Sequence, residues 1–250
     1  MIRETLKLLA LFIVLHSSPA WAQAENRSLT FAVDPNWPPM EYLDSGGRLI
    51  GFSIDYFTAV CKELGYTPNF IPVDWSEIFN GLDKGQYDAV VASVTITSER
   101  RQAMDFTIPY YIVRQCLIVR ADSDLNNILQ LKNKRVATLA GSSATETVEK
   151  IPGTISVTYP ETVAGAFDDL LKGKIDAIVC EDVVGAAFLS EAAYSGRLKI
   201  SSVIKTPGAE ELYAAAVKKG NLGVLIDLNE GIKAIKAKGL EDELRRKWLK

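Results

Sequence analysis

Lys84-Gly-Gln-Tyr-Asp-Ala-Val-Val91 returns 88 residues later as Lys172-Gly-Lys-Ile-Asp-Ala-Ile-Val179, and this repeat decides the fold. Each copy follows an apolar stretch at helical spacing, contains a glycine that ends the helix, and runs into a buried strand. Two copies of one unit predict two lobes of similar build, each of roughly 100 residues. Ligands of open α/β sheets bind beyond the carboxyl ends of strands, so we look for a site just after each copy.

The first 22 residues have the pattern of a secretory signal peptide. Arg3 and Lys7 precede the apolar run Leu8–Leu15, and Ala20-Trp21-Ala22 fits a cleavage site. The run is too short to span a bilayer, which needs about 20 residues, and no Cys follows the cleavage point to carry a lipid. The alternative is an N-terminal helix packed on the domain. We expect export, with the mature protein free in the periplasm or outside the cell.

Composition excludes several classes of function. Without the signal peptide the chain has 26 basic and 30 acidic residues, a net charge of −4, which argues against nucleic acid as a partner. The only histidine, His16, lies in the signal peptide, so no imidazole remains for a triad or a zinc site. We expect that the protein is not an enzyme and that it binds neither a cofactor nor a metal ion. The cysteines, Cys61, Cys116 and Cys180, are odd in number, and we expect no disulfide.

The order of the predicted elements indicates an α/β fold with a mainly parallel sheet in each of two lobes. Residues 29–93 read as strand, helix, strand, helix, strand, and Arg135 begins a second such series. After Thr206-Pro-Gly208, a strand over 211–217 and helices over 222–249 have no third sheet to build, so we expect them to return to the first lobe. Two crossings, near 110–118 and 202–208, would form a hinge. The expected divisions are 1–22 signal peptide, 23–112 with 207–250 lobe 1, and 113–206 lobe 2.

The residues after the first repeat suit an anion. Ser93 and Thr95 present alternating hydroxyls, Arg100 adds a planar guanidinium, and a loop that opens a helix presents backbone N–H groups. Together these groups predict a receptor for a carboxylate or a phosphate. The alternative is helix capping by Thr97 or Ser98, with Arg100 in a surface ion pair.

The second lobe offers both an anion site and an acid. Ser143 lies in Gly141-Ser-Ser-Ala-Thr145, between a strand and a helix, where an anion or a simple N-cap fits. Glu181 follows the second repeat strand, where a carboxylate can pair with an ammonium group. Its alternative is a solvated acid beside Asp182 as the N-cap. If both lobes hold one ligand, closure depends on that ligand.

Two tryptophans complete the candidate site. Trp37 and Trp75 each lie near an Asp and just past an expected strand end, where they would form aromatic walls, or else belong to the core. Asp34 is a cleft-edge candidate, better placed than Asp74. Three prolines in residues 34–42 lead us to expect a loop there, without helix or central strand.

These motifs, in this order, resemble the extracellular solute-binding proteins of family 3, the periplasmic polar amino acid-binding proteins of ABC transporters. The resemblance is carried by Asp34–Pro39, Gly51-Phe-Ser-Ile-Asp55, Ser93–Arg100, Asp105–Tyr111, Gly141-Ser142 and the closing run from Gly231 to Trp248. It implies a two-lobe type II periplasmic binding protein. It also implies that Arg100, Thr95 and Ser143 hold an α-carboxylate, that Glu181 takes an α-ammonium, that Trp37 and Trp75 flank the ligand, and that Asp34 faces its side chain.

The resemblance implies a monomeric receptor that closes around an L-amino acid, with polar or basic ones favoured, and delivers it to a membrane ABC permease. This sequence departs from the family by Glu181 in place of the usual Asp, and by the lack of a Cys in Tyr66–Pro72 to pair with Cys61. Two alternatives stand beside it. One is a ligand-sensing domain that partners a membrane sensor, and the other is a cyclohexadienyl or arogenate dehydratase, whose acid would match Val184.

Overall fold

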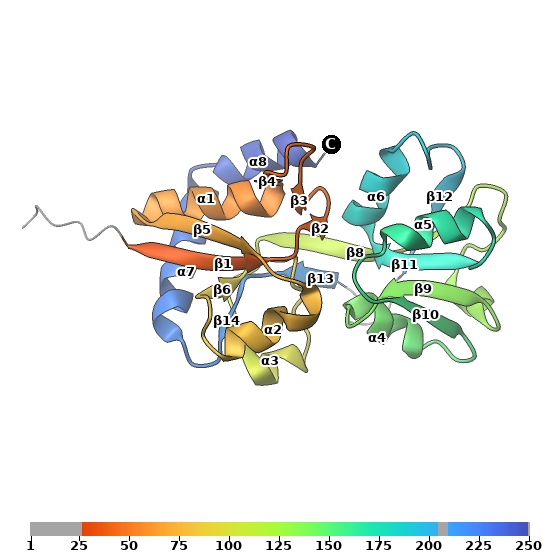
Figure 1. Cartoon of the computed structure of the whole chain (residues 1–250), viewed down its shortest axis with the longest axis horizontal. Coiled ribbons are helices and arrows are strands. Elements are labelled where there is room, and N and C mark those ends of the chain that lie inside the picture. The colour runs from red at the N-terminus through yellow and green to blue at the C-terminus, as the bar shows by residue number, and fades with distance from the viewer. Residues whose placement is uncertain (1–26, 205–209, 250) are drawn as a thin grey trace, which may run out of the picture.

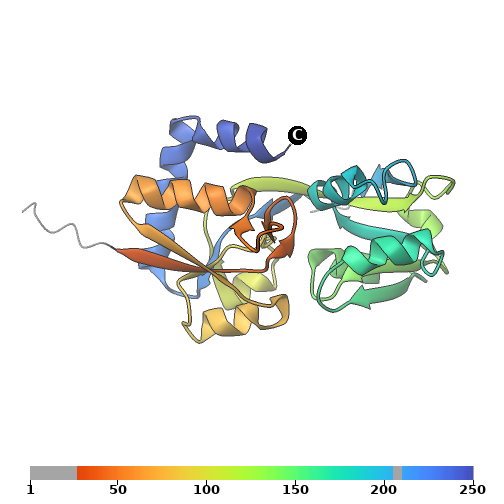
Figure 2. The ribbon, with the colours of Figure 1, turned by 45° about the horizontal axis from the view of Figure 1, so that its top comes forward.

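The structure is a computed structural model that describes residues 27–204 and 210–249, so the expected signal peptide lies outside the described residues. Two lobes lie side by side along the long axis, and β8 (Tyr111–Arg120) runs from one toward the other (Figure 1). The view turned by 45° separates the same two bodies (Figure 2). None of the helices among the described residues is long and apolar enough to cross a bilayer.

The sheet of the first lobe has five strands. In spatial order they are β5 (Thr67–Pro72), β1 (Ser28–Val33), β6 (Ala89–Val90), β14 (Ala216–Lys218) and β7 (Met104–Phe106). β1 pairs in parallel with β5 and β6, and β14 is antiparallel to both of its neighbours. Four strands therefore point one way, and only β14, which follows the return from the other lobe, points against them.

The second sheet repeats this arrangement. Its order is β10 (Ile155–Tyr159), β9 (Arg135–Leu139), β11 (Ala177–Glu181), β8 and β12 (Leu198–Val203). β9 is parallel to β10 and β11, while β8 is antiparallel to β11 and β12. Again one strand is reversed, and it is the one that enters from the other lobe. The expected α/β architecture with a mainly parallel sheet in each lobe is confirmed.

Helices cover both faces of the first sheet because successive strand residues point to opposite sides. Phe31 and Val33 pack in one cluster with α1, and Ala32 packs in another with α2. α7 packs on α1. The helices of this lobe are α1 (Phe52–Leu64), α2 (Trp75–Asp83), α3 (Arg100–Ala103), α7 (Leu222–Ala237) and α8 (Leu240–Trp248).

The second sheet alternates in the same way. Ile178 of β11 packs with α5 (Ala164–Leu171) and α6 (Asp182–Ser190), while Val179 packs with α4 (Ser143–Glu149). A 3-10 helix, η1 (Ile128–Leu131), precedes β9. The three cysteines are buried as free thiols, and Cys116 of β8 lies opposite Cys180 of β11.

The segment between the lobes is a two-stranded ladder. β13 (Glu210–Tyr213) pairs antiparallel with the start of β8, from Glu210 opposite Arg114 to Tyr213 opposite Tyr111. The first expected crossing, near 110–118, falls on β8, and residues 205–209 of the second expected crossing lie outside the described residues. Because the two strands pair with each other, they would bend together.

Two expectations about local structure were wrong. Residues 34–42 are not all loop, because β2 (Asn36–Trp37) and β3 (Glu41–Leu43) form a small sheet with β4 (Leu49–Ile50). Pro35 precedes β2, and Pro38 and Pro39 occupy the turn between β2 and β3. The strand expected over 211–217 is two strands. It breaks because the Ala214 amide donates to Val94 O and the Ala215 amide to Thr107 Oγ1, which moves the chain from β8 to the first sheet.

Candidate functional site

A cavity of about 340 Å³, part of it open to solvent, lies between the lobes. We call it the interlobe cavity. Its lining consists of Asp34, Trp37, Glu41, Trp75, Ala92, Ser93, Thr95 and Arg100 from the first lobe, and Leu139, Ser142, Ser143 and Glu181 from the second. The structure therefore brings all eight residues selected from the sequence to one place, although they come from both lobes.

Arg100 forms the cationic wall of the interlobe cavity. Its Nη1 donates to Thr95 O at 2.9 Å and to Thr95 Oγ1 at 2.7 Å, and its Nη2 donates to Gly141 O at 3.0 Å. Its guanidinium carbon lies 5.3 Å from the ring centres of both Trp75 and Phe79. These contacts hold the planar group in a fixed orientation, which suits it to bidentate recognition of a carboxylate.

Helix capping and an anion site are compatible in this loop. Glu99 is the N-cap residue of α3, and Thr97 Oγ1 accepts from the Arg100 amide at 3.1 Å, so Thr97 satisfies the first amide of the helix while the Arg100 side chain lines the cavity. Ser93 has φ 49°, a left-handed conformation that is uncommon outside glycine and that recurs at functional sites. Thr95 forms an isolated bridge with Tyr213, which ties the loop to the ladder between the lobes.

The turn between β9 and α4 contains two adjacent serines, Ser142 and Ser143, whose side chains make different contacts. Ser142 is the N-cap of α4, and its Oγ accepts from the Thr145 amide at 3.4 Å. Ser143 Oγ accepts from Gln115 Nε2 at 3.3 Å, and both side chains are buried. Capping is therefore the role of Ser142, while Gln115 positions the hydroxyl of Ser143 in the cavity wall.

Glu181 is a buried acid and not a solvated one. It ends β11 with 4% of its surface exposed, and it lies opposite Gln115 of β8. The neighbouring Asp182 Oδ1 accepts from the Val183 amide at 2.9 Å at the start of α6. The solvated-acid alternative is wrong because β11 carries Glu181 into the space between the lobes before the helix begins.

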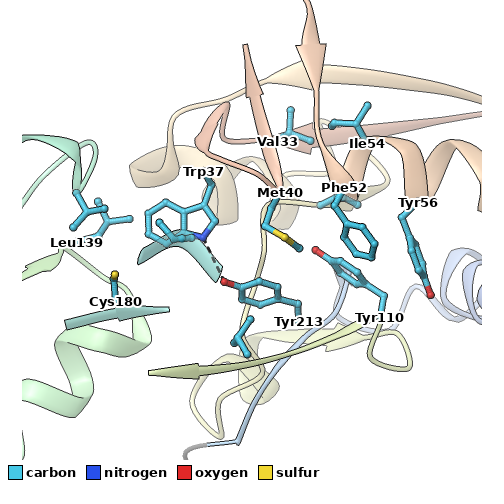
Figure 3. Packing of buried hydrophobic residues seen from close by; sticks show 14 of the residues in the cluster. Val33, Trp37, Met40, Phe52, Ile54, Tyr56, Tyr110, Leu139, Cys180 and Tyr213 are labelled. Carbon is cyan, nitrogen blue, oxygen red and sulfur yellow. Dashed lines mark hydrogen bonds between the residues drawn. The ribbon is translucent and has the colours of Figure 1, made fainter. Parts of the chain in front are cut away.

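The two tryptophans line the cavity and also pack against the core. Trp37 is 7% exposed, and its Nε1 donates to the Tyr213 hydroxyl at 3.4 Å. Figure 3 shows this indole between Tyr213 and Leu139 of the other lobe. Trp75 meets Phe79 edge to face, with ring centres 4.9 Å apart. Both rings are therefore held in place and present flat apolar surfaces to the cavity.

Asp34 is 4% exposed, and its burial raises its pKa to about 6 from an ordinary 3.8. Asn36 Nδ2 donates to Asp34 Oδ1 at 2.8 Å and opposes the rise. Asp74 is exposed and does not line the cavity. The preference for Asp34 over Asp74 agrees with these positions.

Sequence reasoning missed Glu41, Ala92, Leu139 and Ser142. Glu41 is the most informative omission, since it is completely buried and burial raises its pKa well above the ordinary range. It escaped notice because residues 34–42 were expected to be loop. A usable signal was present, because Glu41 stands in the same short segment as Asp34 and Trp37 and follows the apolar Met40.

Comparisons with known proteins agree with this geometry. A probable histidine-binding protein of Neisseria gonorrhoeae is 28% identical over 234 residues, which cover 92% of this chain and 86% of the relative. ABC transporter arginine-binding protein 1 of Escherichia coli (strain K12) is 28% identical over 244 residues, 97% of this chain and 99% of the relative. A solved structure of an ancestral arginine-binding protein bound to arginine matches with a TM-score of 0.82 and 30% identity, over 89% of this chain and 98% of that one.

The likeness to solved binding proteins confirms the expected two-lobe type II fold. Residues 29–250 match the model of the bacterial extracellular solute-binding proteins, family 3. A match over this range, with relatives aligned over 86% and 99% of their own length, establishes membership. This chain belongs to the bacterial extracellular solute-binding proteins, family 3.

Proposed function

We propose that the protein is a receptor that closes around an L-amino acid and delivers it to a membrane ABC permease. The observation that carries this proposal is the distribution of charge across the interlobe cavity. Arg100 and Thr95 line it from the first lobe, and Ser143 and Glu181 from the second. A zwitterion could place its α-carboxylate on Arg100, Thr95 and Ser143 and its α-ammonium on Glu181, and would thereby join the two lobes.

The remaining lining supports a polar or basic side chain. Trp37 and Trp75 would flank an aliphatic or planar stem, and Asp34 would face its far end. The names of two relatives state histidine and arginine as their ligands, which agrees with this class. Ser93 would contribute through its contact with Glu41, whose Oε2 accepts from Ser93 Oγ at 3.2 Å.

Closure would occur by bending of the β8/β13 ladder, between a first lobe of residues 23–112 with 207–250 and a second lobe of residues 113–206. A ligand that contacts both lobes favours the closed state because it binds that state more tightly. We further propose that residues 1–22 direct export to the periplasm and that the mature receptor is a monomer. An unidentified permease would then recognise the closed form.

Native mass spectrometry of the protein as purified, followed by calorimetry with the twenty proteinogenic amino acids, tests the proposal. We expect one bound amino acid per chain and a dissociation constant in the micromolar range or below. A protein that binds none of them would overturn the receptor function.

No observation favours the dehydratase alternative. Val184, the position that would match the catalytic acid, is an apolar residue of α6 that is fully buried. Incubation with prephenate and arogenate should leave both unchanged. A sensing role would use the same cavity and differ only in the membrane partner, so pull-down of a permease or of a sensor from membranes distinguishes the two.

A further inference from the structure

We infer that the end of α8, residues 247–249, is a steric stop that limits how far the two lobes open. It faces α6 of the second lobe across a groove on the far side of the β8/β13 ladder from the interlobe cavity. The stop would set the affinity for the ligand without touching it. The inference rests on the proposed closing motion and assigns a role to a part of the fold that ligand contact does not use.

A second space lies between the lobes, and we call it the back groove. It encloses about 1220 Å³, part of it open to solvent. One wall is the end of α8 together with Pro39 and Tyr111, and the other wall is α6, including Ala186 and Ser190. Among the described residues none lines both the back groove and the interlobe cavity. The two spaces are therefore separate, although both lie between the same two lobes.

The back groove and the interlobe cavity lie on opposite sides of the β8/β13 ladder. Figure 1 shows α6 and the end of α8 above β8, whereas α2 and α4, which begin at the cavity residues Trp75 and Ser143, lie below it. Glu181 lines the cavity and the next residue, Asp182, lines the groove. Because the lobes would rotate about the ladder, a rotation that widens the cavity narrows the groove.

The lobes are closed on the cavity side in this structure. Arg100 Nη2 donates to Gly141 O at 3.0 Å, from one lobe to the other. Figure 3 shows Trp37 of the first lobe beside Leu139 of the second. The back groove therefore has the width of the closed state, and opening of the cavity would move α6 toward the end of α8.

The end of α8 is fixed to the first lobe. Asp55 Oδ2 accepts from Trp248 Nε1 at 2.7 Å and from Lys247 Nζ at 2.6 Å. Arg245 lies over the ring of Tyr111 at the start of β8, with its guanidinium carbon 4.8 Å from the ring centre. These contacts make α8 move with the first lobe, so its last turn would block α6 and would not yield to it.

Such a stop acts on affinity through the ligand-free protein. A ligand that binds the closed state has an apparent dissociation constant equal to the intrinsic one divided by the fraction of closed protein. A larger side chain in the back groove would occupy space that α6 needs during opening, and overpacking destabilises the open state. The closed fraction then rises, and affinity increases by the same factor for every ligand because the contacts with the ligand are unchanged.

Ala186→Trp tests the inference, and Ser190→Trp is a second variant one turn further along the same face of α6. Both residues are exposed and line the back groove, so an indole there does not enter the core. Ala193→Trp is the control, because Ala193 is exposed and lies outside both linings.

Calorimetry with L-arginine and L-glutamine measures the effect on affinity. We expect both groove variants to lower the dissociation constant at least about threefold, by the same factor for the two ligands. The control should bind both ligands like the wild type. An affinity gain that differs between arginine and glutamine would assign the effect to the ligand site and would overturn the inference.

Distances between two spin labels measure the opening without any ligand. The labels are attached through Glu77→Cys on α2 and Glu149→Cys on α4, two exposed positions on the cavity side of the ladder, while the native cysteines are buried. The ligand-free labelled parent should show a population at long distance. Adding Ala186→Trp or Ser190→Trp should reduce that population, and adding Ala193→Trp should leave it unchanged.

The outcomes distinguish this inference from the proposed function. A wild type that binds none of the proteinogenic amino acids overturns the receptor function, and the spin-label distances still decide whether the groove limits opening. The stop is refuted if the groove variants keep the distances of the parent, or if the ligand-free parent shows only the short distance of the closed state.

Discussion

Arg100 Nη2 donates to the carbonyl of Gly141 at 3.0 Å, which joins the loop of the first lobe directly to the turn of the second. Gly141 has φ 69°, and a Cβ at this position would lie 3.5 Å from Trp75 Nε1. The turn thus lies against both the guanidinium and the indole of the opposite lobe. The proposed carboxylate site and the contact between the lobes use the same side chain.

Replacing Arg100 should therefore weaken binding severely. We expect Arg100→Ala to lower amino acid affinity at least about 30-fold, because loss of a desolvated charge partner costs about 2–5 kcal/mol. Arg100→Lys keeps the charge but loses the planar guanidinium, so its affinity should lie between that of Arg100→Ala and that of the wild type. Calorimetry measures both variants.

The neighbouring Arg101 provides the control for Arg100. Its guanidinium lies 5.9 Å from the ring centre of Phe106, its side chain is exposed, and it does not line the cavity. Arg101→Ala should bind like the wild type. Equal losses of affinity in Arg100→Ala and Arg101→Ala would mean that the positive charge of this region, and not a specific contact with Arg100, attracts the ligand.

Much of this site is predictable because it follows short, strongly patterned strands. The repeated glycine and the apolar run after it locate β6 and β11, and Ser93 and Glu181 come within three residues of those strand ends. The positions of Thr95, Arg100 and Ser143 follow from the same logic of strand, loop and helix. The local sequence pattern is sufficient to predict the position of a side chain that directly follows a strand or helix, because that element positions it.

Glu41 was not predictable in this way because its environment is built from distant parts of the chain. Its hydrogen-bond partner Ser93 is 52 residues away, and further neighbours come from α1, β11 and β13. The strands β2 to β4 have only two or three residues each, too few to show a period. The split of β13 from β14 has a similar cause, since it depends on which strands the chain meets after it crosses between the lobes.

The raised pKa of Asp34 predicts a dependence of stability on pH in the empty protein. The folded chain retains the Asp34 proton up to about pH 6, while the unfolded chain loses it near 3.8. The contribution of Asp34 to the free energy of unfolding therefore decreases as pH rises from 4 to 6 and stays low above 6. Asp34→Asn should raise the free energy of unfolding at pH 7 by about 1–3 kcal/mol.

Urea unfolding of the ligand-free wild type and Asp34→Asn at pH 4.5 and pH 7 measures this effect. The difference between the two proteins should be small at pH 4.5 and large at pH 7. The exposed Asp124 of the second lobe serves as the control, and Asp124→Asn should differ little from the wild type at either pH. A difference for Asp34→Asn that is the same at both pH values would exclude titration of Asp34 as the cause.

The cysteines should be unreactive in the folded protein. Burial raises the pKa of Cys61 to about 12, and a hydrogen bond with Cys116, together with burial, raises the pKa of Cys180. A thiolate-selective colorimetric reagent at pH 8 should therefore react slowly with the native chain and release three equivalents after denaturation. A single equivalent after denaturation would reveal a disulfide between Cys116 and Cys180, which lie on opposite strands.

Two glycines of α7 should respond to alanine in opposite ways. A Cβ at Gly231 would lie 2.7 Å from Val60 Cγ1 and 3.1 Å from Leu64 Cδ1, where α7 packs on α1, whereas a Cβ at Gly223 meets nothing within 4 Å. The gain in helix propensity is at most about 1 kcal/mol, and overpacking costs about 1–3 kcal/mol. Gly231→Ala should lower the Tm by a few degrees, and Gly223→Ala should raise it slightly, as measured by thermal unfolding.

Neither residue lines the cavity, so ligand affinity should be unchanged in both variants. A stabilising Gly231→Ala would mean that α1 and α7 can move apart without cost.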